Sequence, residues 1–322
     1  MSPWVKLLAV ATSVLSLAGG ALAQDYPNKP VRLLVGYAPG GTPDVMARVI
    51  GERLSKSMGQ AFIVENKPGA GAIPATEAVA RAAPDGYTLL VADIGQLAIS
   101  PYLFKKVPFD PMKDFAPISM VASTPLFIAV NPSLNINTLQ DLIARAKKEP
   151  GKLSYGSAGI GSIHHISMES LKNDLALDIT HIPYKGSGQS VPAFMAGDVS
   201  VLAGALPALL PAIQGNKAKL LAVTSTKRFS TRPDIPTVAE TIKGYDYPSE
   251  VGFLAPAGTP PAIINRLATE INKLLKDPDV IKRLEGLGSD AVGTTPAEYT
   301  ENLRRNMQKY EKAVKVSGAK VE

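Results

Sequence analysis

The sequence predicts an α/β fold built as two domains, because strand-like and helix-like segments alternate along most of its 322 residues. The run 31–35, VRLLV, follows a proline and has the apolar composition of a short interior strand in a parallel sheet. The alternation continues to residue 92 as strand, helix, strand, helix and strand, which is the doubly wound pattern. A second α/β series follows between residues 139 and 223. Apolar segments at 119–131 and 251–254 connect the two series, so two chain crossings predict a hinged clamshell.

Turns rich in glycine and proline separate the expected elements. The first domain is expected to contain strands at 31–35, 62–65 and 88–92 and helices at 42–58 and 74–83. The second is expected to contain helices at 139–148, 163–172, 189–196 and around Leu209, and strands at 153–155, 179–182, 199–202 and 220–223. The chain then returns through a strand at 251–254 and ends in helices at 261–275, 278–287 and 295–316. The expected domains are therefore 24–124 with 244–322, and 125–243.

A glycine turn follows the first strand and ends at a helix N-terminus. Its signals are three glycines, an expected N-cap threonine, a first-turn proline and a first-turn carboxylate, namely Gly36, Gly40, Gly41, Thr42, Pro43 and Asp44. Glycines let backbone N–H groups approach a ligand, and a helix N-terminus adds partial positive charge, so an anion is the expected guest. A similar turn at 154–162, SYGSAGIGS, precedes the helix that begins near residue 163. Two such turns suggest that both domains face one ligand.

The first 23 residues have the three parts of a secretory signal peptide. Lys6 supplies the positive n-region, 7–17 the apolar h-region, and Ala21-Leu22-Ala23 the cleavage site, so the mature chain is expected to begin at Gln24. No later stretch approaches about 18 uninterrupted apolar residues, so no membrane span is expected. The chain has no cysteine that could carry a lipid. These features favour the periplasm as its location, with secretion to the medium as the alternative.

The charge pattern does not suggest nucleic-acid binding. The formal net charge is +6, but both signs are interspersed, and Lys147-Lys148 and Arg304-Arg305 are isolated pairs on expected helices. Mild basicity in an exported protein is more simply a general attraction for small anions. Without cysteine, the chain has no disulfide and no thiolate chemistry.

The sequence shows no motif for catalysis, cofactor binding or metal binding. Neither Ser157 nor Ser162 has the Gly-x-Ser-x-Gly surroundings of a nucleophile elbow, and Gly69-Ala70-Gly71 lacks the third glycine of a dinucleotide fingerprint. His164 and His165 are adjacent, so on a helix they point about 100° apart, which is poor spacing for joint metal ligation. We therefore predict a binding protein with no catalytic residue, cofactor or metal, and an exported hydrolase is the weaker alternative.

Short motifs spread over the whole mature chain form a combination that is highly specific, although each is weak alone. They are Tyr26-Pro27-x-Lys29-Pro30, Gly40-Gly41-x-x-Asp44, Asn66-Lys67-Pro68-Gly69-Ala70-Gly71, Pro84-Asp85-Gly86-Tyr87-Thr88, Lys113-Asp114-Phe115, Tyr155-Gly156-Ser157, Pro183-Tyr184-Lys185-Gly186, Leu221-Ala222-Val223-Thr224 and Ala255-Pro256-Ala257-Gly258-Thr259-Pro260. With these motifs the chain resembles the periplasmic solute-binding receptors of the tripartite tricarboxylate transporter system, often called Bug receptors. The resemblance implies a two-domain periplasmic-binding-protein fold, or Venus flytrap, with two hinge crossings and a type II-like topology. It also implies a monomer that binds a small organic carboxylate without turning it over and delivers it to membrane transporter subunits.

In that family, the glycine loop after the first strand and the serine-rich loop of the second domain grip the ligand, partly through ordered water. Carried over by position, and extended to neighbouring strand ends, the candidate ligand-binding residues are Tyr37, Pro39, Gly40, Gly41, Asp44, Asp93, Ser157, Gly161, Ser162, Tyr184, Lys185, Ala205 and Phe253. Several have a structural alternative. Asp44 could cap the helix and orient water, Lys185 could be an exposed turn lysine, and the aromatic residues could be core packing.

Two departures from the family pattern affect the expected ligand. Ala72-Ile73-Pro74 is bulkier and stiffer than the glycines that many relatives have, and Glu250 replaces a frequent aromatic, which would place a carboxylate at the pocket rim. No arginine lies in either gripping loop, which favours a mono- or dicarboxylate over a tricarboxylate. Tyr37, Tyr184 and Phe253 leave room for an aromatic acid. A carboxylate sensor that signals to a membrane kinase would use the same cleft and stays open as an alternative.

Overall fold

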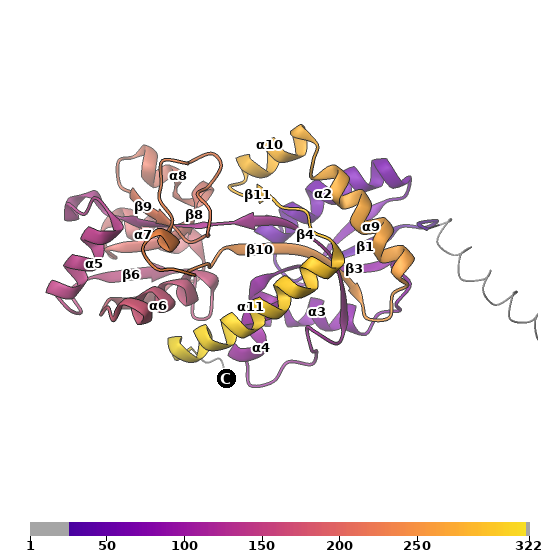
Figure 1. The fold of residues 1–322 in the computed structure, drawn as a ribbon, viewed down its shortest axis with the longest axis horizontal. Helices are drawn as coiled ribbons and strands as arrows, with labels where there is room; N and C mark the ends of the chain where they lie inside the picture. Colours follow the sequence, from indigo (N-terminus) through magenta and orange to yellow (C-terminus); the bar gives the residue numbers. More distant parts are fainter. Residues whose placement is uncertain (1–25, 320–322) are drawn as a thin grey trace, which may run out of the picture.

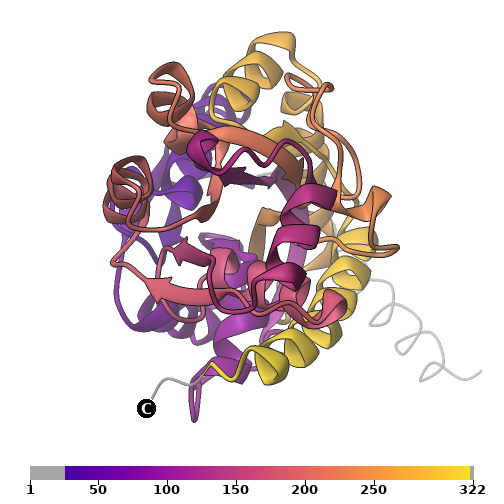
Figure 2. The same cartoon turned by 90° about the vertical axis from the view of Figure 1, so that its left-hand side faces the viewer.

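The computed structural model describes residues 26–319, so the predicted signal peptide and its cleavage site lie outside the described residues. Two lobes lie side by side along the long axis of the molecule, and each is built on its own sheet (Figure 1). We call them the first lobe, which contains β1, and the second lobe, which contains β6. Figure 2 shows the molecule end-on, with the second lobe toward the viewer. Within residues 26–319, no helix is both long and apolar enough to span a membrane.

The sheet of the first lobe has six strands in the order β11-β4-β10-β3-β1-β2. The three strands β1, β2 and β3 are parallel, whereas β10 is antiparallel to both β3 and β4. The strands are β1 (Val31–Val35), β2 (Phe62–Asn66), β3 (Thr88–Asp93), β4 (Phe115–Thr124), β10 (Ser249–Pro256) and β11 (Asp290–Ala291). The carboxyl ends of β1 and β3 therefore lie at one edge, where open α/β sheets bind ligands.

Helices cover both faces of this sheet. On one face, α2, α9 and α10 pack over Leu33, Val91 and Phe253, and on the other face α3 and α11 pack over Leu34 and Leu254. Burial on both faces explains why these strands have near-continuous apolar sequences. The helices are α2 (Thr42–Met58), α3 (Ile73–Ala80), α4 (Ser100–Leu103), α9 (Pro261–Leu274), α10 (Pro278–Gly286) and α11 (Pro296–Ser317), with the short segments η1 (Ala70–Ala72) and η2 (Gly95–Ile99).

The sheet of the second lobe has five strands in the order β7-β6-β8-β5-β9. Its core has two layers: α5 and α6 cover Ile128 and Tyr155, and α7 and α8 cover Phe127 and Leu202. The elements are β5 (Leu126–Val130), η3 (Pro132–Leu134), α5 (Leu139–Lys148), β6 (Ser154–Ser157), α6 (Ile163–Leu175), β7 (Thr180–Pro183), α7 (Ser187–Ala196), β8 (Val201–Ala205), α8 (Leu206–Gln214), β9 (Lys219–Val223) and η4 (Val238–Glu240).

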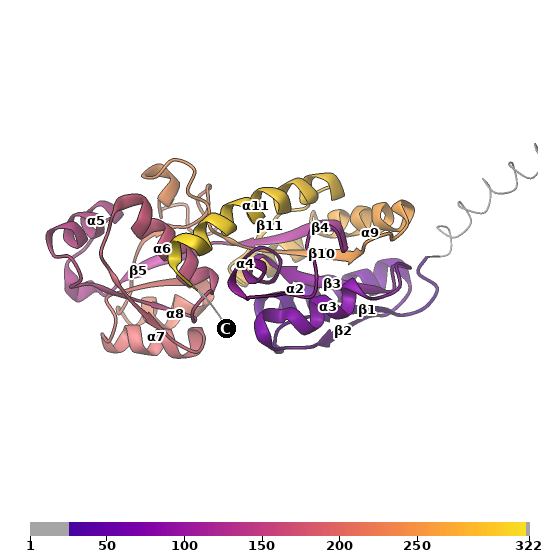
Figure 3. The ribbon, with the colours of Figure 1, turned by 90° about the horizontal axis from the view of Figure 1, so that it is seen from below.

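Three segments connect the lobes. The chain passes from β4 to β5 at Pro125 and returns through β10, as the sequence predicted for 119–131 and 251–254. The last helix, α11, also runs between the lobes (Figures 1 and 3) and packs with Tyr310 and Val314 against Ile166 of α6. The domain boundaries at residues 124 and 244 stay a prediction.

The expected elements agree with the structure to within a few residues, but one helix cap was misplaced and several short elements, including β11, were not predicted. Thr42 was expected to cap α2, but the N-cap is Gly41, and Thr42 is the first helical residue. No helix was predicted directly after β3, where the π-helix η2 and the single-turn α4 follow one another. This helical segment brings Leu103 toward the second lobe, where it packs near Ile166.

Candidate ligand-binding site

The strand ends of both lobes surround two adjoining cavities. The larger, which we call the large compartment, has a volume of about 610 Å³ and is lined by both lobes, from Gly41 and Thr42 to Ser187 and Ala205. The smaller, the small compartment, has a volume of about 350 Å³ and lies between Gly71 and Leu103 of the first lobe and Gly161 of the second. The two compartments share part of their lining, namely Tyr37, Asp93, Ala158, Ile163, His164 and Ser249. Together they form one cleft between the lobes.

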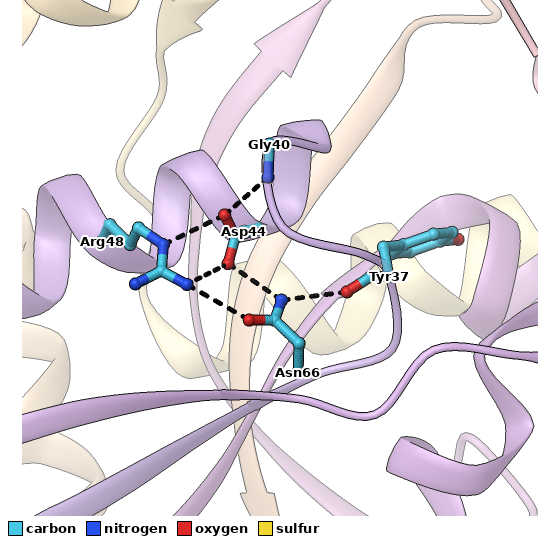
Figure 4. A network of polar contacts seen from close by, with 5 residues as sticks. All are labelled: Tyr37, Gly40, Asp44, Arg48 and Asn66. Atoms are coloured by element: carbon cyan, nitrogen blue, oxygen red, sulfur yellow. Dashed lines mark hydrogen bonds and ion pairs between the residues drawn. The ribbon is translucent and has the colours of Figure 1, made fainter.

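A polar network fixes the glycine loop between β1 and α2 (Figure 4). The Asp44 carboxylate, whose side chain is 2% exposed, accepts hydrogen bonds from the Gly40 N–H at 2.9 Å and from both Nε and Nη2 of Arg48. Asn66 Nδ2 donates to Asp44 at 2.9 Å and to the Tyr37 carbonyl at 2.9 Å. Burial alone would raise the Asp44 pKa, but these hydrogen bonds hold it below its usual value. Asp44 therefore holds the loop and does not line the cleft.

This network changes which N–H groups can meet a ligand. Because the Gly40 N–H donates to Asp44 and the Gly41 N–H donates to the Ala38 carbonyl at 3.3 Å, neither of these two amides is free. The N-cap of α2, Gly41, makes no side-chain capping bond, and neither does Gly186, the N-cap of α7. The first-turn amides of a helix have no i−4 partner within it. Pro43 in α2 has no N–H, and the Gln189 N–H in α7 donates to the Gly186 carbonyl at 3.1 Å, so the remaining first-turn amides of the two helices are those left for water or a ligand. Both helix starts line the large compartment.

In the second lobe, serine side chains hold the loop between β6 and α6. Ser157 is fully buried, its Oγ lies 2.7 Å from His181 Nε2, and it accepts from the Gly159 N–H at 3.1 Å. Ser162 Oγ donates to the Gly159 carbonyl at 2.7 Å and caps α6 by accepting from the His165 N–H. Ser157 thus positions the loop from behind, whereas Ser162 lines the small compartment.

All three histidines of the chain lie around this loop. The rings of His165 and His181 stack with centroids 4.1 Å apart, and His165 Nδ1 accepts from the Gly161 N–H at 3.1 Å. His164 lines both compartments, and its Nδ1 has no partner among the described residues. Burial lowers the pKa of His164 and of His181 to about 4, so both are neutral at pH 7. In the described part of the chain, no three metal-ligating side chains are grouped to hold an ion.

One acid faces the cleft. Asp93 ends β3, lines both compartments and accepts a hydrogen bond from the Tyr37 hydroxyl at 2.6 Å. Burial raises the pKa of Asp93 above its usual value. Hydrogen bonds from the Tyr37 hydroxyl and from the Gln96 and Gly95 amides oppose this increase in part. Burial and the neighbouring Asp93 raise the pKa of Tyr37 well above its usual value. At neutral pH this tyrosine is therefore a hydroxyl donor to Asp93.

The structure places about half of the predicted site residues on the cleft wall. Those that line it are Tyr37, Gly40, Gly41, Asp93, Gly161, Ser162 and Ala205, and those that line neither compartment are Pro39, Asp44, Ser157, Tyr184, Lys185 and Phe253. Phe253 is fully buried in the core under α2 and α9. Lys185 is exposed in the turn between β7 and α7, and Tyr184 packs against the core of the second lobe.

The expectation that Glu250 lies at the pocket rim is wrong. Its carboxylate points toward α11, where it accepts hydrogen bonds from Asn302 and Asn306, and burial raises its pKa. The cleft is instead lined by the preceding residue, Ser249. Side chains alternate between the two faces of a strand, so neighbouring residues of β10 face opposite sides.

Sequence reasoning missed several lining residues. His164 was considered as a metal ligand or a structural residue and not as part of the ligand site. Ser187, which follows the Pro183-Tyr184-Lys185-Gly186 turn, was passed over although it begins α7. A small residue directly after a glycine turn is the signal that would have found Ser187. Ser249 and Pro207 carry no such local signal, because their position depends on how the lobes meet.

Gly161 should be sensitive to any side chain. Its φ is +76°, and a Cβ there would lie 2.2 Å from Leu103 Cδ2 of the first lobe. We expect Gly161→Ala to lower the free energy of unfolding by about 1–2 kcal/mol through backbone strain and to push the lobes apart. Thermal unfolding and the radius of gyration in solution would measure the two effects. Gly159→Ala, at a φ of +124°, would bring its Cβ 3.2 Å from the Tyr184 carbonyl of the same lobe, so it should show strain within the second lobe without a contact to the first. Equal radii for both variants would contradict the contact with Leu103.

The comparison with family models identifies this fold. Residues 46–318 match the model of the tripartite tricarboxylate transporter family receptor. The chain belongs to this receptor family. The resemblance noted from the sequence motifs is therefore confirmed.

Individual proteins and solved structures are similar over nearly the whole chain. The protein BugT of Bordetella pertussis is 35% identical over 325 residues, covering 98% of each chain. The structure of R. palustris Rpa4515 with adipate is 32% identical with a TM-score of 0.80, covering 92% of this chain and 100% of that one. MatC from Rhodopseudomonas palustris, with bound malate, is 29% identical with a TM-score of 0.74, covering 90% and 100%. The two-lobed periplasmic-binding-protein fold is thus shared with these structures.

Proposed function

We propose that this receptor captures a small organic carboxylate in the cleft between its lobes and delivers it to membrane transporter subunits. The observation that carries the proposal is the pair of helices, α2 and α7, that begin at the same cavity without side-chain caps. Their first-turn amides need acceptors, and the positive ends of two helix dipoles favour an anion there. A carboxylate supplies both acceptor oxygens and negative charge.

The two helices belong to different lobes, which gives binding a mechanical consequence. A ligand held first at α2 of the first lobe attracts α7 of the second, so binding favours the closed arrangement of the lobes. Pro125 and β10 are the crossings about which the lobes move. The closed form is the one that docks on the transporter. The receptor acts as a monomer in the periplasm, after cleavage following Ala23.

The size and lining of the cleft support a small ligand. A volume of about 610 Å³ is within the usual range for small-molecule pockets. The relatives solved with adipate and malate carry acyclic dicarboxylates. Of the three aromatic residues predicted for the site, Tyr37 lines both compartments and Phe253 and Tyr184 line neither; Phe104 lines the small compartment alone. This lining favours an aliphatic acid over an aromatic one.

Thermal unfolding against a panel of carboxylates tests the proposal. A ligand at about 100 times its Kd should stabilise the folded protein by ~2.7 kcal/mol, which is a Tm increase of several degrees. The compound should be recovered unchanged. Ala205→Phe, which places a ring in the large compartment, is expected to abolish the increase. If no carboxylate raises the Tm of ligand-free protein, or if Ala205→Phe responds like the wild type, the cleft is not a carboxylate site.

A further inference from the structure

The charge inside the cleft has an unexpected sign for a carboxylate site. Of all the residues that line the two compartments, Asp93 alone has a formally charged side chain, and none is lysine or arginine. If the starts of α2 and α7 together hold one carboxylate of a ligand, a second carboxylate in the same compartment would meet Asp93 and no side-chain cation. Like charges at close range disfavour each other strongly in a partly buried site.

Hydrogen bonds hold the Asp93 carboxylate mainly through one of its two oxygens, Oδ1. The hydrogen bonds from the Tyr37 hydroxyl at 2.6 Å and the Gln96 N–H at 3.2 Å both go to Oδ1. A Cβ on Gly95 would lie 3.0 Å from Asp93 Oδ1 and 3.2 Å from the Tyr37 hydroxyl, so the glycine leaves room for this pair. The Gly95 and Asp93 amides lie close enough to lower the Asp93 pKa as well, but among the described residues no hydrogen bond as short as that from Tyr37 goes to Oδ2. The carboxylate is oriented by its neighbours and keeps an acceptor for a ligand.

The groups around Asp93 are uncharged and can accept hydrogen bonds, because a neutral imidazole has one acceptor nitrogen and a hydroxyl accepts as well as donates. His164 lines the same two compartments, is neutral at pH 7, and has a ring nitrogen, Nδ1, without a partner in the described part of the chain. The Ser249 hydroxyl is on the same shared wall and can accept or donate. A cationic hydrogen-bond donor is the group that this wall suits best, because it satisfies these acceptors and neutralises Asp93.

We propose that the ligand carries a protonated amine as well as a carboxylate, and that Asp93 receives the ammonium group. The inference rests on the proposed function: the carboxylate binds at the starts of α2 and α7, and the ammonium lies at the wall formed by Tyr37, Asp93 and His164. Asp93 and the two helix starts line the same large compartment, so one small molecule reaches both. The ligand class is therefore an aliphatic amino acid.

Matched ligand pairs test the ligand class in the unmodified protein. Dissociation constants are measured by calorimetry for aliphatic α- and ω-amino acids and for the same molecules without the amine, together with dicarboxylates of equal length. We expect an amino acid to bind at least tenfold more tightly than its amine-free partner. If an amine-free mono- or dicarboxylate binds more tightly than every matched amino acid, the inference is wrong while the carboxylate receptor stands. If no compound of either kind binds, the proposed function itself fails.

Asp93→Asn tests the residue. This variant keeps the shape and removes the charge, so the affinity for the amino acid should fall about 30-fold, and that for an equal-length dicarboxylate should rise. Asp198→Asn is the matched control, because this exposed acid lies outside both compartments and changes the net charge equally. An equal loss for aminated and amine-free ligands in Asp93→Asn would assign Asp93 a structural role and overturn the inference. Should Asp93→Asn fail to fold, the ligand pairs on the wild type decide.

Discussion

Asp44→Ala should lower the free energy of unfolding by about 3 kcal/mol and weaken ligand binding at least tenfold. The side chain is 2% exposed, and its removal leaves the Gly40 N–H and one Asn66 N–H without their acceptor. A buried polar group that loses its partner costs about 1–3 kcal/mol, and here two lose it together. Because the same network sets the start of α2, the loop that faces the ligand should lose its fixed shape. Urea unfolding and ligand calorimetry would measure both effects.

Arg48→Ala is the matched control for this network. The Arg48 side chain is 52% exposed, so its ion pair with Asp44 is screened by solvent and should contribute less than about 1 kcal/mol. Asp44→Asn keeps the volume but cannot accept from all donors, and it should lie between the two. If Asp44→Ala matches Arg48→Ala in both stability and affinity, the loop does not depend on the buried carboxylate.

The elements that sequence predicted well are those with strong local signals. The strand at 31–35 and the helix at 42–58 have the predicted bounds because an apolar run, a glycine turn and a Thr-Pro-Asp helix start coincide. The N-cap was misplaced by one residue because Gly41 takes the extended cap conformation itself, with φ of −69°. Helix propensity does not distinguish these two neighbours, since both threonine and glycine are accepted at an N-cap.

The site was predicted less completely, because it depends on how the lobes meet. The loops after β1 and β6 were found from their glycines, but the π-helix after β3 has no turn signal in GQLAI and was not predicted. Phe253 shows a second limit. Its position in β10 puts it on the same face of the sheet as the cleft residue Ser249. It lies four residues further along the strand, about 13 Å away, under α2 and α9. The alternation of residues along a strand predicts which face of the sheet a side chain is on. Only the tertiary structure shows whether that part of the face lines the cleft or lies under helices.

Acid should destabilise this protein through its three histidines, His164, His165 and His181. Burial lowers the folded-state pKa of all three, to about 4 for His164 and His181. Their contribution to stability is therefore complete above the unfolded value of 6.5 and is lost as the pH falls toward 4, because only the unfolded state binds the protons. At about 1.4 kcal/mol per pKa unit, His164 accounts for a loss of about 3 kcal/mol. His181 adds to this loss, and its pKa is lowered by burial and in part by the neighbouring His165.

Neighbouring acids and bases shape this pH dependence. Near His165 and His181, Glu169 opposes the lowering of the pKa and Lys172 reinforces it. Asp93 and Glu250 have raised pKa values, so their protonation favours the folded state and partly offsets the histidines as the pH falls. The histidine contribution is therefore isolated best as a difference between the wild type and a histidine variant.

His164→Gln isolates the contribution of His164 to the pH dependence of stability, because the glutamine amide does not titrate. The free energy of unfolding of the wild type should fall by about 3 kcal/mol more than that of His164→Gln between pH 7 and pH 4. Binding should weaken over the same range, because His165 Nδ1 accepts from the Gly161 N–H and loses this bond when protonated. Urea unfolding at several pH values measures the first effect and calorimetry the second. Parallel stability curves for the two proteins would show that His164 has the same pKa in the folded and unfolded states, and would contradict its assigned role in acid destabilisation.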